Sequence, residues 1–124
     1  MKYLWIALGG AAGAVARYWL TVLISQRFET RFPLGTFAIN MSGCFLIGLF
    51  VTVLDAHASL PAALRYLMPI GFVGAYTTFS TFELETYRAV TIGAGSIALL
   101  NVVLSVVIGY VAVYAGVAAG KLLA

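Results

Sequence analysis

The stretch GFVGAYTTFSTF at residues 71–82 decides how the chain can fold. It places two glycines, a threonine pair and a Ser-Thr pair inside an otherwise apolar region. Pro69, just upstream, lacks a backbone N–H and weakens a helix at this point. We therefore predict a membrane helix that is broken around Gly74–Thr78. The alternative is a kinked but continuous helix whose serine and threonine hydroxyls bond to their own carbonyl groups.

The rest of the chain predicts an all-α membrane protein. Of its 124 residues, 63% are hydrophobic and 9% are charged, and the mean hydropathy is +1.05. A soluble domain carries roughly a quarter charged residues, so lipid has to solvate most of this surface. A helical span needs roughly 20 residues. Four spans, the third of them broken, then fill residues 1–124 as a single transmembrane domain, at about 3–24, 34–54, 62–87 and 97–123.

The positive charges give little preference for one orientation in the membrane. If the spans alternate, one end holds Lys2, Arg65 and Lys121, and the other holds Arg27, Arg31 and Arg88. Three against three leaves the positive-inside rule almost nothing to act on, and Arg17, inside the first span and nearer the first loop, tips the count only weakly. The chain can then insert in both orientations, and two copies can pair antiparallel as a dual-topology homodimer. The alternative is one weakly specified orientation.

The break offers ligand groups of two kinds. Irregular backbone at membrane depth persists only where it is buried in protein or lines a cavity. Free carbonyls there can coordinate a cation, and the next helix N-terminus presents N–H groups to an anion. Phe79 and Phe82 share one helical face, with Ser80 and Thr81 between them. Because the edge of a phenyl ring is positive, these residues predict an anion pathway, and we place it at a dimer interface.

Other polar residues also lie in the predicted spans. Asn40 and Asn101 are costly in lipid and should face protein or water. Ser105 follows Asn101 by one turn and extends a polar stripe along the fourth span. Arg17 needs a partner or a route to the headgroups. Glu85 lies near the end of the third span, where solvation by water is the simplest explanation.

Several function classes are disfavoured by the residues. His57 is the only histidine, and no nucleophile with a nearby base or phosphate-binding loop is present, so we expect no enzyme. The charges are scattered, which argues against a nucleic-acid partner. A small multidrug transporter also has four spans and dual topology, but it needs a carboxylate in its first span. That span contains Arg17 and no Asp or Glu. A non-transporting assembly subunit would not explain the polar cluster of the third span.

Three stretches, in order along the chain, resemble the Fluc fluoride channels, also called the CrcB family. They are GGAAGAVAR at 9–17, GTFAIN at 35–40 and GFVGAYTTFSTF at 71–82. The resemblance implies a fluoride-selective channel in the bacterial inner membrane, a plasma membrane, that passively exports fluoride from the cytoplasm. It also implies two pathways per antiparallel homodimer and a structural Na+ at the dimer centre.

The resemblance assigns roles to individual residues. The Na+ would be held by backbone carbonyls of Gly74 and Thr77 from each copy. The fluoride pathway would include Asn40, Phe79, Ser80, Thr81, Phe82 and Ser105, while Arg17 and Glu85 match further family positions. The chain departs from the family pattern at Ala75, which often is a second glycine, and Tyr76 follows it. A methyl group at position 75 restricts positive φ, so the geometry of the break stays open.

Overall fold

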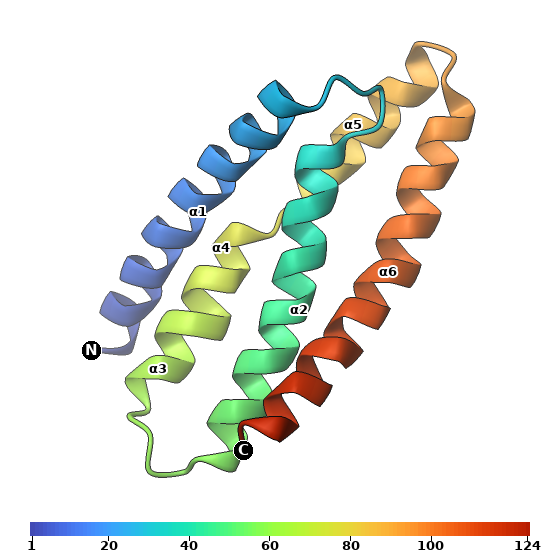
Figure 1. The fold of residues 1–124 in the computed structure, drawn as a ribbon. Helices are drawn as coiled ribbons and strands as arrows, with labels where there is room; N and C mark the ends of the chain where they lie inside the picture. Colours follow the sequence, from blue (N-terminus) through green and yellow to red (C-terminus); the bar gives the residue numbers. More distant parts are fainter.

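The computed structural model describes all 124 residues and shows an all-helical bundle (Figure 1). Helices α1 (Lys2–Arg27), α2 (Leu34–Ala56) and α6 (Gly95–Leu122) are long and apolar enough to cross a membrane. Both ends of α1, α2 and α6 lie within about three residues of the ends expected from the apolar runs. Helix α1 continues to Arg27 because backbone hydrogen bonding does not stop where the apolar side chains end.

The remaining span consists of four shorter pieces. They are α3 (Ala63–Arg65), the π-helical segment η1 (Tyr66–Val73), α4 (Gly74–Tyr76) and α5 (Phe79–Thr91). Pro69 lies inside η1, where the wider π-helical turn accommodates a residue that lacks an N–H. The prediction of an all-helical chain with four helices and a bent third helix is confirmed.

The break lets the third span change neighbours. Segments η1 and α4 pack against α1, whereas α5 packs against α6 (Figure 1). The first half fits closely because an added Cβ at Gly9 or Gly13 of α1 would collide with backbone carbonyls of Leu67 or Phe72. Glycines that allow such close approach are typical of helix packing in membranes. The two halves of the span are therefore held by different helices, with the break between them.

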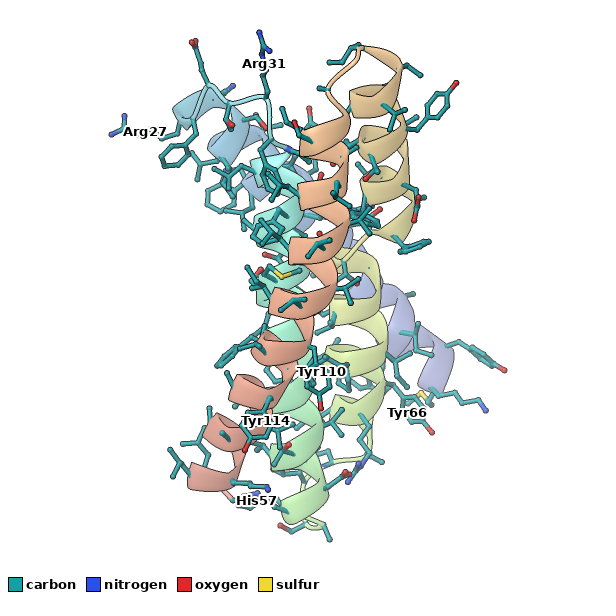
Figure 2. All side chains as sticks on the ribbon, turned by 90° about the vertical axis from the view of Figure 1, so that its right-hand side faces the viewer. Arg27, Arg31, His57, Tyr66, Tyr110 and Tyr114 are labelled. Carbon is teal, nitrogen blue, oxygen red and sulfur yellow. The ribbon has the colours of Figure 1, made fainter.

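The two ends of the bundle carry equal numbers of cationic side chains. The α1–α2 and α5–α6 loops lie at one end, and the α2–α3 loop and both termini lie at the other (Figure 1). Arg27 and Arg31 accordingly lie at one end and His57 at the opposite end (Figure 2). The spans therefore alternate, and the predicted division of three cations at each end follows from this topology.

Most large apolar side chains face outward. Only 17 of 124 residues are buried, and the exposed side chains include Val103, Val106, Tyr110 and Tyr114 on α6. A contiguous apolar surface of this extent needs lipid or a protein partner to cover it. Tyr110 and Tyr114 lie on the face of the bundle that is turned toward the viewer in Figure 2.

Candidate ion pathway at the helix break

Two threonines, and not the glycines, form the break. Helix α4 ends at Tyr76, and Thr77 (φ −82°, ψ 157°) and Thr78 (φ −149°, ψ 116°) are extended before α5 begins at Phe79. Thr78 caps α5, because its Oγ1 accepts a hydrogen bond from the Thr81 N–H at 3.3 Å and donates one to Thr81 Oγ1 at 3.0 Å. The only positive φ in the chain belongs to Gly93, so Ala75 is compatible with this break.

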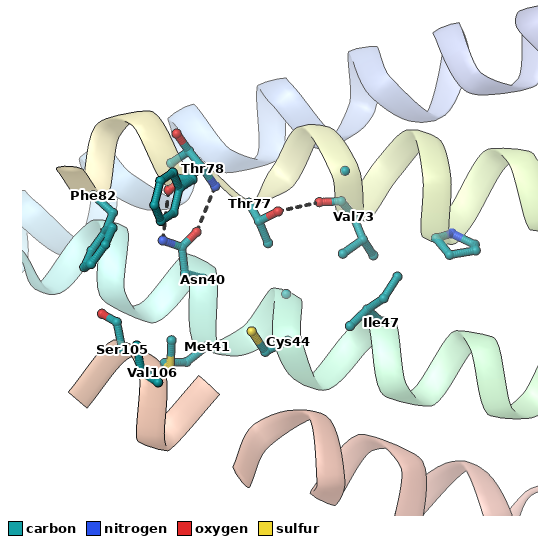
Figure 3. Close-up of a pocket in the computed structure, with 14 residues that line it drawn as sticks. Asn40, Met41, Cys44, Ile47, Val73, Thr77, Thr78, Phe82, Ser105 and Val106 are labelled. Carbon is teal, nitrogen blue, oxygen red and sulfur yellow. Dashed lines mark hydrogen bonds between the residues drawn. The ribbon is translucent and has the colours of Figure 1, made fainter. Parts of the chain in front are cut away.

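The side chain of Asn40 pairs with the exposed peptide groups of the break. Its Oδ1 accepts from the Thr78 N–H at 2.8 Å, and its Nδ2 donates to the Thr78 carbonyl at 3.0 Å (Figure 3). An amide NH2 group has two hydrogens, so one remains for a ligand. Thr77 Oγ1 donates back to the Val73 carbonyl at 3.0 Å. Asn40 therefore faces protein, as predicted, and satisfies backbone groups that would otherwise be unpaired in the membrane.

The hydrogen bonds of Asn40 and Thr78 leave two backbone carbonyl groups without their helical donors. In a continuous α-helix, the N–H of Thr78 would donate to the carbonyl of Gly74, and the N–H of Thr81 to that of Thr77. In this chain those donors go to Asn40 Oδ1 and Thr78 Oγ1 instead. The Gly74 and Thr77 carbonyls thus lack their helical donors, and such carbonyl oxygens are suitable ligands for a cation.

A cavity of about 440 Å³ opens beside the break (Figure 3). It brings together six of the predicted site residues, which are Asn40, Gly74, Thr77, Phe79, Phe82 and Ser105. The ring centroids of Phe79 and Phe82 are 5.6 Å apart. Phe82 is 7% exposed, whereas Phe79 is 73% exposed and protrudes. Ser105 Oγ is buried without a hydrogen-bond partner, so its O–H can serve a ligand.

Three of the other predicted residues line two further cavities. Thr81 and Arg17 line a second cavity of about 240 Å³, which shares Thr78 with the first. Glu85 lines a third, of about 250 Å³, which shares Thr36 with the second. Ser80 lines none of these three cavities and is exposed. Neighbouring cavities are thus separated by single threonine side chains.

Thr36 lines both the second and the third cavity, and no role was predicted for it from the sequence. Thr36 Oγ1 donates to Glu85 Oε1 at 2.9 Å, so Glu85 is bonded within the protein at one oxygen. Its Oε2 is buried without a partner. Thr36 precedes Asn40 by four residues, which puts both on one face of α2. That spacing is a signal by which Thr36 could have been found.

Comparison with known proteins identifies the family. The family model of the CrcB-like protein, Camphor Resistance (CrcB), matches residues 4–117. The chain belongs to this family. CrcB/FluC proteins are channels and not enzymes, and membership makes the chain a multi-pass membrane protein, as predicted.

Close relatives cover almost the whole chain. A protein of Acidobacterium capsulatum is 58% identical over 98% of this chain and 97% of its own length. A protein of Solibacter usitatus is 51% identical over 94% of this chain and 95% of its own length. A protein of Maridesulfovibrio salexigens is 38% identical over 98% of this chain and 97% of its own length. All three carry the name fluoride-specific ion channel FluC.

Proposed function

We propose that the chain is a fluoride-selective channel that passively exports fluoride from the cytoplasm and so relieves fluoride toxicity. The observation that carries the proposal is the cavity beside the break, where Phe79, Phe82, Ser105 and Asn40 meet. Fluoride is strongly hydrated, so its pathway has to replace water with other hydrogen-bond donors and polarised C–H edges. The names of the relatives support fluoride as the ion.

The cavity offers donors without a fixed positive charge. These donors are the unpartnered hydroxyl of Ser105, the second amide hydrogen of Asn40 and the positive edges of the two phenyl rings. Conduction needs binding that is strong enough for entry and weak enough for exit. Neutral donors meet both needs better than a buried arginine would. Ser80 and Thr81 would continue the row of hydroxyls, with Arg17 and Glu85 towards the loop end.

An antiparallel homodimer would complete the site. The cavity is open on one side, and Phe79 is 73% exposed there, so a second copy would cover it. Crossing two breaks on a twofold axis would bring the Gly74 and Thr77 carbonyls of both copies together. Two oxygens from one copy are too few for a hard cation, and four are better matched to a structural Na+. Such an ion supplies positive charge between carbonyl dipoles that otherwise repel. Each copy would then contribute to two fluoride pathways.

Fluoride efflux from liposomes tests the proposed function. Purified protein is reconstituted with internal potassium fluoride and chloride, and valinomycin carries the compensating potassium current. We expect rapid fluoride loss at a fluoride electrode and no chloride loss, without any pH gradient. Fluoride that stays trapped would contradict the proposal. Flux that requires a proton gradient and a lipophilic cation would instead indicate a transporter of the small multidrug type.

A further inference from the structure

Tyr76, the last residue before the break, forms a hydrogen bond that the proposed pathway does not use. The side chain is 5% exposed, and its hydroxyl lies 2.9 Å from Ser42 Oγ on α2. The single hydroxyl hydrogen of Ser42 points to α2 itself, because Oγ lies 2.8 Å from the Ala38 carbonyl and 3.0 Å from that of Ile39. Tyr76 is therefore the donor and Ser42 the acceptor.

The ring of Tyr76 is held as firmly as its hydroxyl. It stacks on Phe72, with ring centroids 5.5 Å apart and an interplanar angle of 13°. Gly43 of α2 lies against it, because an added Cβ there would be 3.4 Å from Tyr76 Cδ1 and would collide with the methyl group of Thr77. Tyr76 thus fits between η1 and a flat region of α2, and a phenylalanine would fill the same space.

Helix α2 consequently holds the chain on both sides of Thr77. Asn40 binds the backbone of Thr78 after it, and Ser42 binds the side chain of Tyr76 before it. The hydroxyl of Thr77 itself forms no bond to α2 and donates only to the Val73 carbonyl at the end of η1. Helix α4 packs against α1, but the chain becomes extended at Thr77, so no following helical turn restrains the end of α4.

From this geometry we infer that Tyr76 and Ser42 are positioning residues of the break. Their hydrogen bond fixes the end of α4, and with it the distance and direction of the Gly74 and Thr77 carbonyls. The part of the inference that concerns a cation rests on the proposed function. Tyr76 does not line the cavity. Its loss should therefore change the stability of the break and not remove a contact to an ion.

Tyr76→Phe in the purified protein tests this inference, because it removes one hydroxyl and keeps the stacked ring. We measure thermal unfolding against Na+ at constant ionic strength, together with amide hydrogen exchange at Thr77 and Thr78. Loss of one hydrogen bond is expected to raise the half-maximal Na+ concentration roughly two- to tenfold and to speed exchange similarly. Tyr3→Phe is the matched control, since Tyr3 is 75% exposed, forms no hydrogen bond and lies outside the cavity, and it should match the wild type.

Ser42→Ala should reproduce the effect, and the double variant should be little worse than either single one, because the same bond is lost. Wild-type Na+ dependence and wild-type exchange in Tyr76→Phe would overturn the inference. If Na+ does not stabilise even the wild type, the proposed central ion is wrong. The exchange rates then decide the role of Tyr76 alone: faster exchange in Tyr76→Phe supports it, and unchanged exchange overturns it.

Discussion

Replacing Asn40 with alanine is expected to slow fluoride efflux on the order of a hundredfold. The variant loses both hydrogen bonds to Thr78, so the backbone N–H and carbonyl groups of Thr78 are left unpaired at membrane depth. Each buried unpaired group costs about 1–3 kcal/mol, and each 1.4 kcal/mol corresponds to about tenfold in rate. Efflux from liposomes measures the loss, and size-exclusion chromatography before reconstitution shows how much folded protein remains.

Asn101→Ala is the matched control for this prediction. Asn101 is also a buried asparagine, at 2% exposure, but its Nδ2 donates to Thr86 Oγ1 at 2.9 Å, a hydroxyl that already donates to the Phe82 carbonyl. Its loss leaves both hydrogen bonds between Asn40 and Thr78 in place, so we expect efflux within about tenfold of wild type. Equal losses in the two variants, or near-normal efflux in Asn40→Ala, would show that the amide does not hold the break.

Replacing Phe82 with isoleucine is expected to slow fluoride efflux up to about tenfold. Isoleucine keeps the apolar bulk of this 7% exposed side chain but removes the positive ring edge. Contacts between aromatic rings contribute up to about 1.5 kcal/mol beyond area burial, and a ring-edge contact of that size with fluoride corresponds to roughly tenfold in rate. Phe79→Ile should act in the same way, since the two rings lie 5.6 Å apart in one cavity.

A phenylalanine outside the cavity separates ring chemistry from general destabilisation. Phe50 lies on α2 and lines none of the three cavities. Phe50→Ile should therefore leave efflux unchanged. Normal flux in both Phe79→Ile and Phe82→Ile would eliminate the phenyl edges as fluoride ligands, even if the fold proved unaltered.

The break could be placed from sequence, but its geometry could not. Pro69 and the glycines indicated an interruption around Gly74–Thr78, and it lies at Thr77 and Thr78. From local composition alone, irregular backbone is expected at the glycines. The threonines are extended because Asn40, 38 residues earlier in the chain, binds Thr78. No local pattern reports a partner so distant in sequence.

The same limit applies to the pairs around the site. Hydrophobic runs and charge counts were sufficient for four spans and for the equal division of cations, because both depend on composition along the chain. The bonds of Thr36 with Glu85 and of Tyr76 with Ser42 join residues 49 and 34 positions apart. Such contacts depend on how α2 packs against the two halves of the third span, and only the folded structure shows them.

An antiparallel crossing of two copies at the break is tested most directly by cross-linking of single cysteines. In a Cys44→Ala background, Gly74→Cys tests the proposed crossing, because an added Cβ there meets nothing within 4 Å in one copy. Leu99→Cys lies two helical turns from the cavity residue Val106 on the same face of α6. With a short bis-maleimide in membranes, we expect dimers from Gly74→Cys and none from Leu99→Cys. Dimers from both positions would indicate parallel copies and would contradict the antiparallel channel.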